Sequence, residues 1–171
     1  DTVVAGGPGE PVTEPQWQPD GSLTFISDRT GWWNLYRWLP GHDIEALVRI
    51  DAEIGVPGWV LGGSRYAVLE DGRVVFARSS RGFDALVVRE VDGRIIELDT
   101  PFTAIGSVRA DGPYAVVCVA GSPQPRWRPG CPRSSALLAL AFGSWRLGYR
   151  GAVAHPAGGS KSARGVNQIP L

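Results

Sequence analysis

Four aspartates stand where their carboxylates could act in pairs, because Asp20, Asp71, Asp92 and Asp111 each come directly before a glycine. Paired carboxylates can serve as a general acid and a general base. An Asp-Gly dipeptide is, however, typical of a tight turn, in which the aspartate accepts backbone N–H bonds and the glycine adopts a positive φ. We therefore predict that these aspartates shape turns rather than catalyse a reaction.

The two histidines, His42 and His155, are the next candidates for chemistry. His42 stands in Pro-Gly-His-Asp, where a solvated turn residue is expected. Metal sites recruit three or four His, Cys, Asp or Glu ligands, and no such cluster can be read in this sequence. We accordingly predict no catalytic, cofactor-binding or metal-binding residue in the chain.

Two cysteines are too few for a disulfide framework. Cys118 stands in the apolar run Tyr-Ala-Val-Val-Cys-Val-Ala and is expected to be a buried small side chain, whereas Cys131 stands in a loop rich in Pro, Arg and Gly. A bridge between them is the less favoured alternative, because no secretory signal precedes them. Since no apolar run approaches the roughly 18 residues of a membrane span, we expect a cytoplasmic location.

Aromatic residues cluster at Trp32, Trp33, Tyr36 and Trp38. They could stack on a peptide or on single-stranded nucleic acid, but packing between sheets is the favoured interpretation. Because neighbours in a strand face opposite sides, one of the two adjacent tryptophans must point outward. Gly-Gly-Pro-Gly at 6–9 and Gly-Gly-Ser at 62–64 lack the strand–loop–helix setting of a phosphate site.

These residues are carried by an internal repeat. The segment Trp17 to Tyr36 aligns without a gap on Val68 to Val87, 51 positions later, so that Asp20-Gly21 falls on Asp71-Gly72 and Phe25 on Phe76. A third copy begins at Val108 and places Asp111-Gly112 a further 40 positions on. Short strands repeated at this period are typical of stacked β-units such as propeller blades.

The pattern predicts an all-β chain with no helix: a partial β-propeller of about three blade-like antiparallel sheets. An irregular lead-in covers 1–14, the propeller 15–150, and a tail of low order 151–171. The three blades are expected at 15–50, 55–100 and 101–150. Strands are indicated by alternation at 23–27, 33–38, 44–48, 73–78, 85–91, 94–99 and 114–120, and more weakly at 136–141 and 145–149.

The net charge of zero hides an asymmetry. Up to Asp111 there are ten basic and seventeen acidic residues (10 − 17 = −7), and after it seven basic residues and no acid. A solvated tail is favoured over a nucleic-acid-binding tail, because the basic residues are scattered. A changed reading frame near Gly121 is a third interpretation. The start at Asp1, without Met, suggests a fragment.

The string Pro-Gln-Trp-Gln-Pro-Asp-Gly at 15–21, followed by Ser-Asp-Arg-Thr-Gly-Trp-Trp-Asn-Leu-Tyr at 27–36, resembles TolB-like blade repeats. It is most similar to propellers of the prolyl oligopeptidase family, in members like dipeptidyl aminopeptidases and acylaminoacyl-peptidases. The likeness covers residues 3–120. It implies that Trp17, Phe25 and Leu35 fill the space between blades, that Asp28 caps the next turn and that Arg29 pairs with an acid.

In that family the propeller stands before an α/β-hydrolase domain, which carries the Ser-Asp-His triad, and limits entry to short peptides. The nucleophile belongs in a Gly-x-Ser-x-Gly elbow, but here Ser162 occupies the place of the second glycine around Ser160. None of the family's catalytic residues carries over. We therefore expect a non-catalytic fragment of a serine peptidase, partnered by the hydrolase domain or the remaining blades, with short peptides as ligands and no nucleic acid or membrane.

Two alternatives stay open: a stand-alone TolB-like interaction module, and an inactive product of truncation or frameshift. Because propellers close with about 4–8 blades, three blades leave exposed edges, and we expect self-association of the isolated chain.

Overall fold

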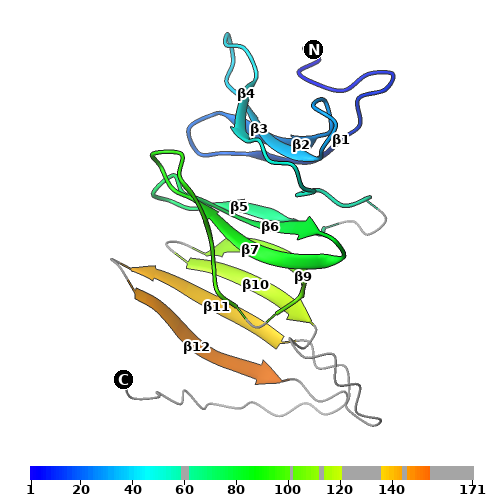
Figure 1. The fold of residues 1–171 in the computed structure, drawn as a ribbon. Helices are drawn as coiled ribbons and strands as arrows, with labels where there is room; N and C mark the ends of the chain where they lie inside the picture. The colour runs from blue at the N-terminus through cyan, green and yellow to red at the C-terminus, as the bar shows by residue number, and fades with distance from the viewer. Residues whose placement is uncertain (59–61, 101, 112–113, 121–135, 144–145, 155–171) are drawn as a thin grey trace.

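The computed structural model describes residues 1–58, 62–100, 102–111, 114–120, 136–143 and 146–154, and from residue 111 onward the backbone alone. All regular elements in this part of the chain are strands, and they form three four-stranded antiparallel sheets stacked one on another (Figure 1). The predicted all-β partial propeller is confirmed. No helix in the described ranges is long and apolar enough to cross a membrane.

Each sheet is a simple meander, in which strands that follow one another in the chain are neighbours. The first sheet contains β1 (Val12–Trp17), β2 (Leu23–Ser27), β3 (Asn34–Trp38) and β4 (Glu45–Val48). The second contains β5 (Tyr66–Val68), β6 (Val74–Ser80), β7 (Phe83–Arg89) and β8 (Ile95–Glu97). The third contains β9 (Ala104–Asp111), β10 (Tyr114–Ala120), β11 (Ala136–Gly143) and β12 (Arg146–Ala154).

The strands follow the predicted order, with shifts at both ends of the propeller. Strand β1 begins at Val12, inside the predicted lead-in, because its pairing with β2 extends as far as Val12 opposite Ser27. The two weakest predictions correspond to β11 and β12, and β12 continues to Ala154, beyond the expected boundary at 150. The predicted tail beyond Ala154 lies outside the described residues.

Three Asp-Gly dipeptides form the same turn. In the first, the Gln18 N–H donates to the Ser22 carbonyl and the Gly21 N–H donates to the Gln18 carbonyl. The same two bonds recur around Gly72 and Gly93, and in each case only the glycine has a positive φ, of 80°, 84° and 89°. This is a three-residue loop with a glycine bulge, rather than the two-residue hairpin turn that Asp-Gly most directly suggests.

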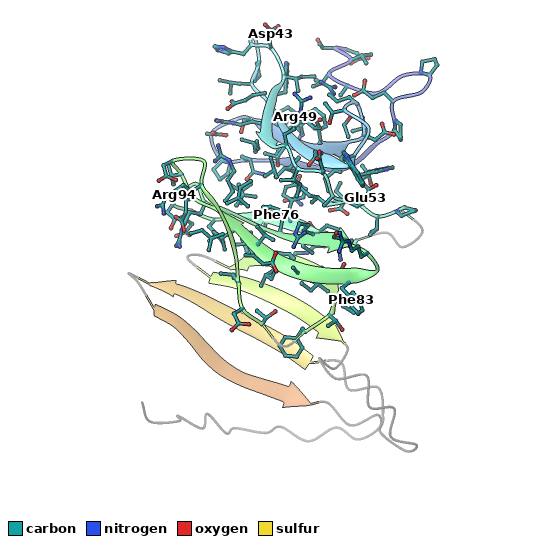
Figure 2. The ribbon with its side chains drawn as sticks, in the orientation of Figure 1. Asp43, Arg49, Glu53, Phe76, Phe83 and Arg94 are labelled. Carbon is teal, nitrogen blue, oxygen red and sulfur yellow. The ribbon has the colours of Figure 1, made fainter. Side chains whose placement is uncertain are left out.

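Apolar side chains fill both spaces between the sheets. Between the first two sheets the cluster consists of Ile26, Leu35, Val48, Ile54, Tyr66, Val74, Phe76 and Val87. Between the second sheet and β9 it consists of Ala67, Leu69, Val75, Ala77, Leu86, Val88, Leu98, Ile105 and Val108. Alternate residues of β6 thus serve opposite clusters, as the two-residue period of a strand requires. Figure 2 shows Phe76 in the layer between the upper two sheets.

Three of the structural roles implied by the family resemblance, those of Trp17, Phe25 and Asp28, are wrong. Leu35 is buried in the cluster between the first two sheets, as implied. Phe25 is also fully buried, but it lies on the other side of the first sheet, where it stacks on Tyr36 and the Arg29 guanidinium lies 5.8 Å from its ring centre. Trp17 is 66% exposed, because it lies on that same side, which no described sheet covers. The Asp28 Oδ1 atom is buried with no hydrogen-bond partner in the described chain, so it does not cap the turn. Instead, the Ser27 hydroxyl accepts the Arg29 N–H at 3.2 Å.

Candidate functional site

The aspartates of the Asp-Gly turns bond to their own turns. Oδ1 of Asp20, Asp71 and Asp92 accepts the N–H two residues ahead, at 2.9, 3.1 and 3.0 Å. Bonds from Ser22 lower the pKa of Asp20, and bonds from Arg73 and Arg94 lower the pKa of Asp71 and Asp92 respectively. These carboxylates are therefore ionised turn caps, as expected, and they lie in separate turns. The Asp111 side chain is outside the described residues.

The other predicted residues do not converge on one place. His42 lies in the turn after β3, where its N–H donates to the Leu39 carbonyl at 2.9 Å. Trp32 is 39% exposed while Trp33 packs against the first apolar cluster, so one of the two points outward as predicted, although both come before β3 begins at Asn34. The predictions for His155, Cys131, Ser160 and Ser162, and for the Cys118 side chain, fall outside the described residues. Within the described residues no three His, Cys, Asp or Glu side chains come together.

The most elaborate polar arrangement is centred on Arg65, whose side chain is only 5% exposed. Its guanidinium forms a two-point ion pair with Asp84, at 3.0 and 3.1 Å. It also donates to the Ser79 hydroxyl at 2.9 Å, to the Ile54 carbonyl at 3.2 Å and to the Ile105 carbonyl. Because such a fork is planar and fixed, these bonds set the relative position of three chain segments.

Asp84 completes the arrangement from the other side. Its Oδ2 accepts the Ile105 N–H at 2.7 Å, so that Arg65 and Asp84 together satisfy both backbone groups of Ile105. Burial raises the pKa of Asp84, but the bonds from Arg65, Ser79 and the Ile105 N–H outweigh it and the pKa is lowered. A charge with this many bonds can remain ionised inside the protein.

A second arrangement joins the first sheet to the second. Glu14 has a φ of +52°, at the point where the register of β1 and β2 shifts. Its carboxylate accepts the Arg65 N–H at 2.7 Å, and its carbonyl accepts the Tyr66 hydroxyl at 2.8 Å. Burial raises the pKa of Glu14. A positive φ is costly for a residue with a side chain, and these two bonds hold it in place.

The repeat relates these two arrangements. Glu14, Arg65 and Ile105 are equivalent positions, since 65 − 14 = 51 and 105 − 65 = 40 are the spacings of the repeat. The Glu14 side chain binds the backbone of Arg65, and the Arg65 side chain binds the backbone of Ile105. Each first strand is thus tied to the next by the side chain of the same repeat position. The sequence analysis did not predict these contacts, although an alignment of the three copies places the charged residues Glu14 and Arg65 at the same repeat position.

Two clefts lie beside these contacts. The inner cleft, of about 740 Å³, lies where the first strands converge and is lined by Thr13, Glu14, Ser64, Arg65 and Gly106, among others. The outer cleft, of about 540 Å³, lies between the first two sheets and is lined by Asp20, Arg37, Glu45, Glu70 and Arg89 with apolar neighbours. The described lining of both clefts contains no histidine or cysteine.

The three-sheet stack matches solved structures of peptidases. A puromycin-hydrolysing peptidase of Mycobacterium tuberculosis is 29% identical, with a TM-score of 0.69 over 85% of this chain and 22% of the other. A puromycin hydrolase is also 29% identical, with a TM-score of 0.67 over 81% of this chain and 20% of its own, and a mutant of it gives the same values. No protein-family model and no curated protein matches the sequence.

The resemblance to the β-propeller of the prolyl oligopeptidase family is confirmed. The structural neighbours are peptidases of that family, and this chain spans about a fifth of their length. The residues that match therefore correspond to one part of a much larger enzyme. In this chain the matching part contains the hydrogen bonds by which Glu14 and Arg65 join neighbouring blades.

Proposed function

We propose that this chain is the non-catalytic propeller portion of a prolyl-oligopeptidase-type peptidase, and that it limits access of short peptides to a hydrolase domain. The observation that carries the proposal is the match of the stacked sheets to a puromycin-hydrolysing peptidase over 85% of the chain.

The hydrogen bonds that Glu14 and Arg65 form between the first strands of neighbouring sheets suit a role in limiting access. A passage through a propeller is selective only if its wall keeps a constant width, and here the wall consists of β1, β5 and β9. Glu14 and Arg65 hold these strands together through backbone bonds, and both side chains line the inner cleft. Rigid walls of this kind exclude large folded substrates by size, while short extended peptides still pass.

The test uses the 171-residue chain and the product of the complete gene that encodes it. We expect the chain to hydrolyse neither puromycin nor aminoacyl nitroanilides, and the complete product to hydrolyse at least one of them. We also expect a Gly-x-Ser-x-Gly elbow in the same frame downstream, whose serine is needed for turnover. Turnover by the chain alone, or a complete product without that elbow, would contradict the proposal.

A further inference from the structure

The first strand of each sheet has one edge, here called the inner edge, that pairs with no strand in the described part of the chain. Strands β1, β5 and β9 stand at the ends of their sheets, and residues of these strands or directly before them line the inner cleft. An unpaired edge presents N–H and C=O groups to which an extended peptide can add as a further strand. Edges of this kind beside a peptide passage would hold peptides instead of letting them pass.

In β5 the inner edge is closed by a side chain. The Ala77 N–H donates to the Arg65 carbonyl, so the next residue, Tyr66, directs its own N–H and C=O away from β6 and toward the inner edge. The Ser64 hydroxyl donates to the Tyr66 carbonyl at 2.6 Å and accepts the Tyr66 N–H at 3.4 Å. Gln16 Nε2 donates to the same hydroxyl at 2.8 Å. One serine oxygen thus occupies both edge groups of Tyr66 and has no bonding capacity left.

The repeat places a proline at the equivalent position of β1. Pro15 corresponds to Tyr66, since 66 − 15 = 51. A proline has no N–H to donate, and within sheets it is confined to edges and bulges. Here it also lies in a bulge, because Glu14 and Pro15 together oppose the single residue Phe25 of β2. The Glu14 carbonyl beside it is already occupied by the Tyr66 hydroxyl, at 2.8 Å.

In β9 the same repeat position is a glycine that interrupts the strand. Gly106 follows Tyr66 by 40 positions, which is the second spacing of the repeat. The residues on either side of Gly106 pair with adjacent residues of β10, so Gly106 forms a bulge with no partner of its own in that strand. Bulges twist a strand edge away from an added strand. Farther along β9, the Val108 N–H donates out of its own sheet to the Ser64 carbonyl, at 2.7 Å.

A proline, a hydroxyl cap and a glycine bulge therefore stand at one repeat position of three successive first strands, and Pro15, Ser64 and Gly106 all line the inner cleft. We propose that they prevent strand addition along the inner edges, so that an extended peptide enters the inner cleft without being held by its backbone. The closed edges follow from the described residues, whereas their part in peptide passage rests on the proposed function. Size and side-chain fit then remain the means by which the passage discriminates among peptides.

The first test uses hydrogen exchange in the 171-residue chain. Ser64→Ala releases both edge groups of Tyr66, and the Tyr66 amide should exchange about tenfold faster, as loss of one hydrogen bond predicts. The Ala67 amide, which faces β6, should stay protected and so shows that β5 remains paired. Thr13→Ala is the matched control, because Thr13 is the equivalent position of β1 and lines the same cleft, but bonds to no inner-edge group in the described residues. Equal exchange at Tyr66 in both variants would overturn the inference.

The second test measures binding of a fluorescent hexapeptide of alternating Thr and Val, acetylated and amidated, by fluorescence anisotropy. Ser64→Ala opens the edge of β5, and Pro15→Ala restores an N–H to that of β1. We expect each of these variants to bind the probe about tenfold more tightly than the natural chain and Thr13→Ala do, because backbone groups become available for pairing. Equal affinities for all four chains, or slowed exchange at Tyr66 when the natural chain meets the probe, would contradict the proposal.

The product of the complete gene separates this inference from the proposed function. Ser64→Ala should lower both KM and kcat for a pentapeptide, since a peptide held by its backbone binds more tightly and leaves more slowly. The values for an aminoacyl nitroanilide, which is too short to add as a strand, should not change. A complete product without peptidase activity would contradict the proposed function alone. Full activity with an unchanged KM for the pentapeptide would contradict the role of the inner edges alone.

Discussion

The two junctions between sheets have similar apolar cores but different polar ties. Where the first sheet meets the second, the Tyr66 hydroxyl bonds to the Thr24 and Glu14 carbonyls at 3.0 and 2.8 Å, mostly without charge. Where the second meets β9, a buried ion pair between Arg65 and Asp84 holds both backbone groups of Ile105. The same packing between sheets can thus be completed by neutral or by ionic bonds, and the two should respond differently to substitution and to pH.

The largest difference is expected from Asp84→Ala. This change leaves the Arg65 charge buried without its partner, and breaking such a pair costs about 3–5 kcal/mol. Urea unfolding at pH 7 and one fixed protein concentration measures the loss. The control is Glu97→Ala, which removes the exposed ion pair with Arg78 and should cost less than about 1 kcal/mol. Similar losses for both variants would mean that burial of the pair does not matter.

The same variant gives a pH test. Because the folded-state pKa of Asp84 is lowered, its stabilisation is present above the unfolded-state pKa of about 3.9 and disappears as the pH falls through the folded value. The stability difference between the natural chain and Asp84→Ala should therefore shrink below about pH 4. A difference that stays constant to pH 2 would exclude the ion pair as its source.

Gly55→Ala should be next in size, because the first junction has no room for a methyl group there. A Cβ atom at Gly55 would lie 2.6 Å from Trp33 Cε3 and 2.9 Å from Ile26 Cγ2. Overpacking of this kind typically costs about 1–3 kcal/mol, measured by the urea midpoint. Gly58→Ala is the control, since its Cβ would meet only the Thr13 hydroxyl at 3.8 Å. If both changes are equally tolerated, the first junction is loosely packed.

Tyr66→Phe tests the neutral tie directly. It leaves the carbonyl oxygens of Glu14 and Thr24 without the hydroxyl and should cost about 1–2 kcal/mol in thermal or urea unfolding. The loss should be nearly the same at pH 4 as at pH 7, because burial raises the already high pKa of Tyr66. A strong pH dependence between these values would show that the tie acts through a charged neighbour.

The smallest effect is expected from Glu14→Gln, and its sign is opposite. Because burial raises the pKa of Glu14 above its usual value, ionisation at neutral pH disfavours the folded state. The amide oxygen of glutamine still accepts the Arg65 N–H. We expect a slightly higher unfolding midpoint at pH 7 and no difference below about pH 4, where both side chains are neutral. A lower midpoint at pH 7 would show that the carboxylate charge is needed at this junction.

The sequence predicted the parts of the fold that depend on neighbouring residues. Alternation at 23–27 and at 114–120 matches β2 and β10, and the Asp-Gly dipeptides mark the bulged turns. Trp17 was predicted wrongly because burial depends on a second surface. A side chain fills the space between two sheets only where a second sheet packs on its face, and no residue near Trp17 in the sequence indicates which face of the first sheet is packed in this way.

The ties of the candidate site were missed for a related reason. Arg65 and Asp84 are 19 residues apart and lie on different segments, so no spacing rule joins them, and a charge beside a strand usually indicates solvent. Their role depends on the backbone of Ile105, which has no sequence signature. The positive φ of Glu14 is equally hidden, because a strained conformation is imposed by contacts from Arg65 and Tyr66.

The cage around Arg65 also bears on the order in which the chain folds. Ile54, Ser79 and Asp84, which surround the guanidinium, all precede Ile105 in the chain. During synthesis from the N-terminus, the groups that will bind the Ile105 backbone of β9 can therefore be in place before β9 is synthesised. A nascent chain arrested after Asp99 should already protect the Arg65 and Ala77 amides from hydrogen exchange, and unprotected amides there would refute this order. The first two sheets would then fold first, and the third sheet would form by docking on a surface that is already ordered.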